Sequence, residues 1–241
     1  MLTAQTNLCA LHENPYPGRG LVVGLDPSAT CLIQAYWIMG RSPNSRNRIF
    51  ATQGGRLWTE AADPSRVKDP SLIIYNAMDE LNGLYMVSNG DQTDTIVQAM
   101  LAGADAFQAL NTRQYEPDAP NFTPRISAVC DLRHGRPTTE LSVLKKSPFS
   151  EGCERQFFRY EQFCPGLGHC ITTYTGDGEP LPPFQGEPYV LPLGETPSTI
   201  MDTFWGALNE VNRVALAVKS IELSSGVSEI LIRNQYEKVE T

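Results

Sequence analysis

The sequence LIIYNAMDELNGLYMVSNGDQTDT, residues 72–95, decides the interpretation of the fold, because it joins two apolar runs, a tight turn and a polar loop. The β-branched and aromatic residues at 72–75 and 84–87 predict two buried strands. Between them, Asn82-Gly83 is a dipeptide typical of a two-residue hairpin turn. The sequence therefore predicts a β-hairpin whose second strand ends in a polar loop.

That polar loop, residues 88–94, crowds short hydrogen-bonding side chains around a glycine directly before a predicted helix. Backbone N–H groups at the helix start could converge there on a ligand together with these side chains. The same residue types also gather at helix starts for purely local reasons, as turns and caps. The residues alone leave both interpretations open.

Length and composition indicate one compact domain, because 241 residues with 41% hydrophobic side chains can bury a large core. The net charge of -8 argues against a nucleic-acid partner, which needs a basic surface. No apolar run approaches the roughly 20 residues that cross a bilayer, and the N-terminus lacks the features of a leader sequence. We therefore expect no membrane association and a cytoplasmic protein.

The six cysteines show no repeated framework, and a chain of this size does not need disulfides, so we expect free thiols. The candidate zinc ligands are Cys153, Cys164, His169 and Cys170. They lack a paired C-x-x-C motif, and Cys170 directly follows the histidine, which makes a tetrahedral site awkward. We expect no metal site.

The rest of the chain predicts many strands and few helices. Further strands are predicted at residues 20–25, 31–39, 49–52, 56–59, 125–132, 138–145, 156–160, 170–174, 213–218 and 229–232. Helices are predicted at residues 95–108 and 198–210, the second with Ser198 as its N-cap, and long loops at 115–124 and 176–197. Residues 1–17 are polar and aperiodic, which predicts an extension or irregular N-terminal arm before a single domain at 18–241. This pattern is typical of an α+β domain in which two sheets are faced by helices.

Several short segments between residues 18 and 132 occur together in a specific order. They are GRGLVVG at 18–24, Tyr36 with Arg41-Ser42 and Arg46, IYN at 74–76, VSNG with Thr93-Asp94 at 87–94, Tyr115-Glu116, and TPRI at 123–126. In this order and at these distances they resemble archaeal-type IMP cyclohydrolases. Little of the sequence after Leu132 adds to the resemblance.

The resemblance implies a four-layer αββα sandwich similar to the N-terminal nucleophile hydrolase fold, without self-processing. It also implies the last step of purine biosynthesis, in which formylated aminoimidazole carboxamide ribotide loses water and closes to inosine monophosphate. Both reacting groups are on one molecule, so the enzyme has to orient them, move protons and stabilise charge on the carbonyl oxygen. No cofactor is needed, the partner is a purine ribotide, and a homo-oligomer is expected.

Glu116, Tyr75 and Arg41 are the residues expected nearest the reaction. Glu116 could transfer protons, and the Tyr75 hydroxyl could donate a hydrogen bond to a developing oxyanion. Arg41 and Arg46 could grip phosphate or carboxamide with their planar guanidinium groups. Each residue could instead have a purely structural role. Glu116 could be a solvated carboxylate, Tyr75 a buried tyrosine with a satisfied hydroxyl, and either arginine a partner in a surface ion pair.

The other substrate-binding candidates come from the same short segments. Asn89 and Asp94 could contact ribose or ring, and Arg125 could bind an anion or hold Glu116 or Asp94 in place. The resemblance adds Arg19 and Asn44 to this set.

Two alternative functions stay open. One is a ribotide-binding protein of the same fold that lacks catalysis. The other is an amidohydrolase of the N-terminal nucleophile type, with Cys9 exposed by cleavage after Leu8. The segment 15–17 separates Cys9 from the strand at Gly20, which disfavours this second alternative because such a nucleophile should begin the first strand.

Overall fold

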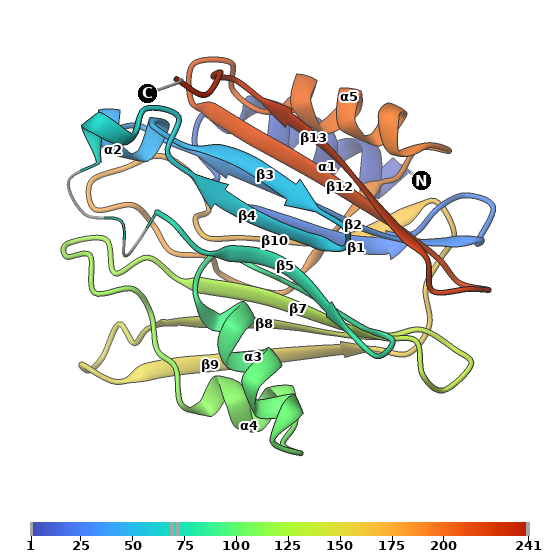
Figure 1. Ribbon diagram of the computed structural model, residues 1–241. Coiled ribbons are helices and arrows are strands. Elements are labelled where there is room, and N and C mark those ends of the chain that lie inside the picture. Colours follow the sequence, from blue (N-terminus) through green and yellow to red (C-terminus); the bar gives the residue numbers. More distant parts are fainter. Residues whose placement is uncertain (1, 68–69, 71–72, 240–241) are drawn as a thin grey trace.

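The computed structural model describes residues 2–67, 70 and 73–239, and its strands form two antiparallel sheets that face each other (Figure 1). The space between the sheets is filled by inward-facing side chains of both, among them Leu21, Tyr36, Val87 and Ile126. Helices cover the outer faces, so the described chain is α+β with the layer order helix, sheet, sheet, helix. Among the described helices, none is long and apolar enough to span a membrane.

The first sheet has six strands in the order β11-β10-β1-β2-β12-β13. Their bounds are Tyr189–Pro192 (β11), Leu167–Thr172 (β10), Gly20–Leu25 (β1), Cys31–Met39 (β2), Arg213–Glu222 (β12) and Ser228–Asn234 (β13). β2 is buried along almost its whole length, as its continuous apolar run predicts for a strand covered on both faces. β11 lies inside the segment 176–197 that the sequence predicted as a surface connection, so that prediction is wrong at residues 189–192.

The second sheet has seven strands in chain order, from β3 to β9. Their bounds are Ile49–Gln53 (β3), Arg56–Glu60 (β4), Asn76–Leu81 (β5), Leu84–Ser88 (β6), Arg125–Asp131 (β7), Thr138–Lys146 (β8) and Cys153–Tyr160 (β9). The strands predicted from residue 125 onward are all present, with shifted ends in both sheets.

The central hairpin exists, but its first strand lies later than predicted. Asn82 and Gly83 adopt φ of 48° and 82°, the left-handed conformation of a two-residue hairpin turn, and this turn pairs Leu81 with Leu84. The turn therefore fixes β5 at Asn76–Leu81. Residues 73–75 precede the strand, and the prediction of a strand there is wrong, while Leu72 lies outside the described residues.

One predicted helix is divided into two. α3 (Gln92–Leu101) and α4 (Ala106–Asn111) replace the single helix predicted at 95–108. Gly103, at φ 84°, interrupts the helix, and Asp105 then caps α4 through a capping box with Gln108. Both helices pack on the outer face of the second sheet, where Ile96 and Leu110 join Leu84 and Met86 of β6 in a separate apolar cluster.

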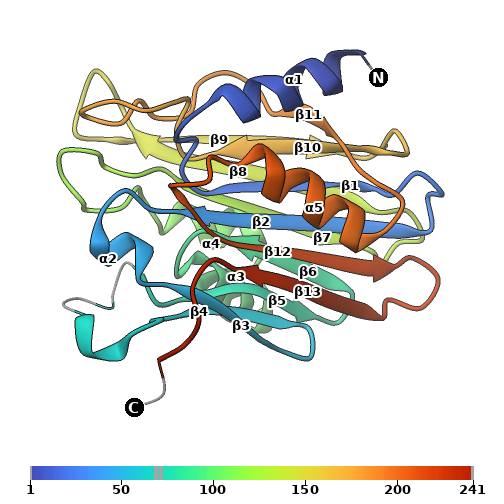
Figure 2. The ribbon, with the colours of Figure 1, turned by 90° about the horizontal axis from the view of Figure 1, so that it is seen from above.

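The first sheet is covered by α1 (Leu2–Glu13) and α5 (Pro197–Ala207), as Figure 2 shows. α5 begins one residue earlier than predicted, because Thr196 rather than Ser198 is its N-cap. The irregular arm predicted for residues 1–17 instead contains α1, which buries Ala4 and Leu11. Two short helical turns, α2 (Pro43–Arg46) and η1 (Pro64–Arg66), complete the elements.

Candidate functional site

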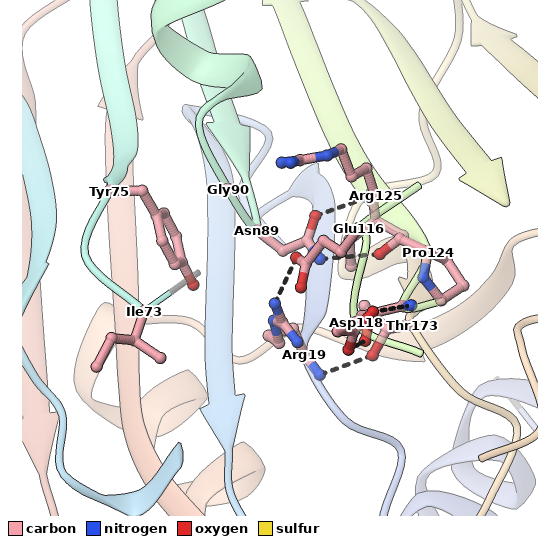
Figure 3. A network of polar contacts seen from close by, with 12 residues as sticks. Arg19, Ile73, Tyr75, Asn89, Gly90, Glu116, Asp118, Pro124, Arg125 and Thr173 are labelled. Carbon is pink, nitrogen blue, oxygen red and sulfur yellow. Dashed lines mark hydrogen bonds and ion pairs between the residues drawn. The ribbon is translucent and has the colours of Figure 1, made fainter. Parts of the chain in front are cut away.

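An ion pair between Arg19 and Glu116 lies at one end of the sandwich (Figure 3). Arg19 directly precedes β1, and Glu116 stands in the loop between α4 and β7. Nη2 of Arg19 donates to Oε1 of Glu116 at 2.5 Å, and the two side chains are only 12% and 4% exposed. The two segments are far apart in the sequence and meet because both border the space between the sheets.

The burial of this pair changes its acid–base properties. Burial raises the pKa of the Glu116 carboxyl, with a contribution from Asp118, although the charges of Arg19 and Arg125 oppose this change. Burial acts to lower the pKa of Arg19, but the charges of Glu116 and nearby tyrosines outweigh it, so that pKa lies well above its usual value. A carboxyl with a raised pKa beside a fixed cation is suited to proton transfer.

The loop that carries Glu116 is held by hydrogen bonds within residues 115–124. The Glu116 N–H donates to the Thr123 carbonyl at 2.9 Å, and the Asp118 carboxylate accepts from the Thr123 N–H at 2.7 Å. Phe122 has φ 44°, a left-handed conformation that costs a bulky residue about 1–3 kcal/mol. The hydroxyls of Thr123 and Tyr174 also contact each other, which ties the loop to the first sheet. Glu116 therefore has a well-defined position.

Two tyrosine hydroxyls lie close together between the sheets. Those of Tyr75 and Tyr36 are 2.7 Å apart and buried. Burial, with the neighbouring Tyr75, raises the pKa of Tyr36 well above its usual value. Arg48 is 2% exposed, and its guanidinium donates to the carbonyls of Ser45 and Met39 at 2.8 and 3.0 Å. Burial lowers the pKa of Arg48, although the nearby Tyr75 and Tyr36 oppose this change.

Tyr36 and Arg48 were missed as site residues from the sequence. The signal for Tyr36 was its place in the strand at 31–39, where alternate side chains face the other sheet. Arg48 ends an arginine-containing turn, and nothing in its local sequence distinguishes it from an exposed arginine.

The polar loop after β6 connects two strands through hydrogen bonds and also holds the side chain of Arg125. The side chain of Asn89 donates to the Pro124 carbonyl at 2.9 Å and accepts from the Ile126 N–H at 2.8 Å, which joins β6 to the start of β7. Nη1 of Arg125 donates to Asp91 at 2.6 Å and to Gln92 at 2.9 Å. Asp91 is the N-cap residue of α3 but makes no side-chain capping bond, so the purely local capping interpretation of this loop does not account for it.

Close packing at Gly90 explains the glycine in this loop. A Cβ at residue 90 would lie 2.5 Å from Nη1 of Arg125 and 2.7 Å from Oε1 of Gln92. Only a residue without a side chain lets the arginine approach the backbone this closely.

The remaining sequence candidates lie outside the buried cluster. Asp94 is exposed on α3 and accepts from Asn76 at 2.7 Å. Arg41 is half-exposed, pairs with Asp177 at 2.5 Å, and lies over the ring of Tyr16 at 5.2 Å. Tyr16 in turn stacks on Tyr174, so Arg41 lies at the rim of the cluster.

Arg46 and Asn44 belong to the short helix α2. The guanidinium of Arg46 donates to the Gly40 carbonyl at 2.9 Å and to the Asn212 side chain at 3.0 Å. Oδ1 of Asn44 is buried and has no hydrogen-bond partner among the described residues.

The cavity beside α1 lies largely apart from the buried cluster. A cavity of about 610 Å³ lies between α1 and the segment around β11, and of the cluster residues only Tyr174 lines it. We place the candidate site at the Arg19–Glu116 pair, because this pair and the nearby hydroxyls of Tyr36 and Tyr75 are buried polar groups. The charged side chains that line the cavity are instead the exposed carboxylates Glu13 and Glu187. Among the described residues, no group of three or more His, Cys, Asp or Glu side chains could hold a metal ion.

The sequence comparisons identify the family of the chain. A family model described as IMP cyclohydrolase-like protein matches residues 16–225, a span that includes Arg19, Tyr75, Glu116 and Arg125 and extends far beyond Leu132. The match leaves α1 outside. No match was found among curated proteins. From the extent of the family match, the chain belongs to the IMP cyclohydrolase-like protein family.

Proposed function

We propose that the protein converts formylated aminoimidazole carboxamide ribotide to inosine monophosphate. The observation that carries the proposal is the buried Arg19–Glu116 pair in a chain of this family, at the same end of the sandwich as the Tyr36–Tyr75 hydroxyls. In the reaction the carboxamide nitrogen attacks the formyl carbon and loses one proton, and the formyl oxygen gains it. The oxygen then leaves as water while the former formamido nitrogen loses its proton and a C=N bond forms.

Glu116 is proposed to accept and return these protons. Its raised pKa suits a group that must be both acid and base, and such catalysis contributes roughly 100- to 10,000-fold. The Tyr75 hydroxyl is proposed to donate a hydrogen bond to the oxygen that gains charge, and Tyr36 is the hydrogen-bond partner of this hydroxyl.

The arginines are proposed to bind the ribotide. Nε of Arg19 is buried without a hydrogen-bond partner among the described residues, so it is available to a substrate oxygen. Arg125 and the rim residue Arg41 are further proposed substrate contacts, and Arg46, Asn44, Asn89 and Asp94 remain proposed substrate-binding residues. We propose that no cofactor takes part and that the active form is a homo-oligomer. We also propose that residues 18–241 are one domain with a likeness to N-terminal nucleophile hydrolases.

The conversion of the formylated ribotide by the purified protein, followed by absorbance, tests the reaction. We expect inosine monophosphate to form in proportion to the protein concentration, and heat-unfolded protein to give only the rate seen in buffer. A folded protein that gives only the rate seen in buffer would contradict the proposed reaction.

A ribotide-binding protein without catalysis is the second candidate, because the Arg19–Glu116 ion pair could serve only to hold two segments together. This candidate predicts that inosine monophosphate raises the melting temperature while no conversion occurs. The amidohydrolase candidate has less support, since Cys9 is exposed in the middle of α1 rather than at the start of a strand.

A further inference from the structure

Lys145, at the end of β8, is a buried cation without an anionic partner among the described residues. It is 3% exposed, and its ammonium donates to the Phe184 carbonyl at 3.0 Å and to the Gln185 side chain at 3.1 Å. No carboxylate oxygen of the described part of the chain lies within 4.0 Å of it. A buried charge is costly unless it is paired, and these contacts use only two of the three ammonium protons.

This lysine lines a cavity of about 200 Å³ beside the loop that carries Glu116. Asn121 and Phe122 of that loop line the cavity together with Lys145 and Lys146. The ammonium of Lys146 lies 4.1 Å from the centre of the Phe122 ring, and it also pairs with Glu151, which is itself largely exposed.

One carboxylate, Glu154, faces the same cavity. It lies opposite Lys145 in the register of β8 and β9, yet it forms no ion pair with Lys145 within 4.0 Å. The charged side chains that line the cavity are therefore two lysines and one glutamate. Lys145, the buried lysine, has no ion-pair partner among the described residues and is available to bind an anionic ligand.

We propose that this cavity is an anion subsite for a phosphate group, with Lys145 as its buried ligand and Lys146 at its mouth. A lysine ammonium is a compact charge that binds phosphate oxygens, which favours a phosphate beside Lys145. Arg41 and Arg46 fit this role less well, since Arg41 already has a carboxylate partner and the guanidinium of Arg46 is used by a carbonyl and an amide oxygen.

The phosphate has two possible sources, the 5′-phosphate of a ribotide and free inorganic phosphate. The ribotide source rests on the proposed function. It would require one ligand to reach both the subsite and Glu116, and the loop that carries Glu116 also lines the subsite. The free-phosphate source does not depend on that function.

Calorimetric titration with inosine monophosphate, inosine and inorganic phosphate separates these sources. The proteins compared are the wild type, Lys145→Met, Lys145→Arg and the distant control Lys238→Gln. We expect Lys145→Met to weaken binding of inosine monophosphate by roughly 10- to 100-fold, the value of one charged hydrogen bond, and to leave inosine binding unchanged. Lys145→Arg should keep most of the affinity, and Lys238→Gln all of it.

If Lys145→Met weakens only the binding of inorganic phosphate, the subsite is supported and its ligand is the free anion. If a folded Lys145→Met binds both phosphate ligands as the wild type does, or if the wild type binds neither, the subsite is wrong. If Lys145→Met does not fold, Lys146→Gln and Glu154→Gln decide instead, because the first should weaken and the second strengthen phosphate binding. Equal phosphate binding by these two variants and the wild type would then overturn the proposal.

The same proteins keep this proposal separate from the proposed function. Phosphate binding that depends on Lys145, in a protein without ribotide conversion, would support the subsite and reject the reaction. Ribotide conversion by a protein whose phosphate binding does not depend on Lys145 would support the reaction and reject the subsite.

Discussion

At the scale of single residues, the buried pair of Arg19 and Glu116 is the feature that requires a functional explanation. Removing two charges from water costs several kcal/mol per ion, and their mutual attraction offsets this only in good geometry. The pair has that geometry, but burial still leaves the Glu116 carboxyl with a raised pKa. A purely structural contact could be made by apolar side chains of similar size, which is why we propose that this pair takes part in proton transfer.

The pH dependence of catalysis should respond to Arg19. Replacing Arg19 by Gln removes the nearest charge that lowers the pKa of Glu116, so that pKa should rise further. If the ionised carboxylate accepts the first proton, the rate falls as pH drops through this pKa. The acidic limb of the kcat profile should therefore move to higher pH in Arg19→Gln and stay near the wild-type position in Arg19→Lys.

The exposed pair of Arg159 and Glu161 provides the control for this measurement. Arg159→Gln should leave the profile unchanged. An acidic limb that stays in place, or that moves to lower pH in Arg19→Gln, would show that Glu116 is not the titrating group.

At the scale of elements, the turn chemistry of the sequence was more informative than its apolar runs. Asn82-Gly83 predicted a hairpin turn correctly, and the turn alone fixes the strand register. The apolar residues 73–75 suggested a strand because they are β-branched and aromatic, but in the structure they lead into β5 and place Tyr75 beside Tyr36. β5 itself contains Asp79 and Glu80, which are unfavourable in strands and concealed it.

The two largest errors in the helices also have local causes. Gly103 and Asp105 divide the region 92–111 into α3 and α4, a stop and start signal that a continuous apolar pattern obscured. α1 has few buried residues and a polar sequence, so its helix depends on packing against β11 and α5, which local sequence does not reveal.

Two glycines with opposite surroundings test the polar loop after β6. Gly90→Ala should place a methyl group against Arg125 and destabilise the protein by about 1–3 kcal/mol. Its melting temperature should fall by roughly 2–4 °C for each kcal/mol, and inosine monophosphate should bind more weakly.

Gly206 is the matched control, because it is exposed on α5 and nothing lies within 4 Å of the position that an added methyl group would take. Gly206→Ala should stabilise the protein by about 0.5–1 kcal/mol through helix propensity. Equal effects of the two substitutions in thermal unfolding would mean that Arg125 does not depend on the close approach at Gly90.

At the scale of the whole molecule, long-range strand order separates what the sequence predicted from what it could not. The alternation of strands and helices predicted two sheets faced by helices, but not that β1 lies between β2 and β10 or that β2 lies beside β12. The pairings of β1 with β10 and of β2 with β12 join residues more than a hundred positions apart, beyond the reach of periodicity. The order of short segments brought Arg19, Tyr75 and Glu116 into one hypothesis, whereas the roles of Tyr36, Arg48 and Lys145 depend on contacts across the sandwich.

The two ends of the sandwich should contribute differently to stability and activity. Lys219 pairs with Gln34 of β2, which in turn pairs with Val23 towards the end of β1 that lies away from Arg19. The ammonium of Lys219 donates to the Gly55 carbonyl at 2.8 Å and to Glu80 at 2.7 Å. Lys219→Met removes both bonds, and Glu80 is partly exposed, so the loss should be about 1–3 kcal/mol. Thermal unfolding should show this loss while kcat stays within about twofold of the wild type.

Lys238→Gln, which removes an exposed pair with Glu60, should change stability by less than about 0.5 kcal/mol. A large fall in kcat of a folded Lys219→Met protein would show that the two ends are coupled and that the site extends through the sandwich.

Proton transfer by Glu116 is tested most directly by the kcat of Glu116→Gln at saturating formylated ribotide, measured beside the wild type and the exposed control Glu161→Gln. Glutamine keeps the shape of the side chain but cannot take a proton, so kcat should fall by roughly 100- to 10,000-fold while inosine monophosphate still raises the melting temperature. Glu161→Gln should turn over like the wild type. A Glu116→Gln protein with wild-type kcat would contradict the assignment of proton transfer to the buried carboxyl.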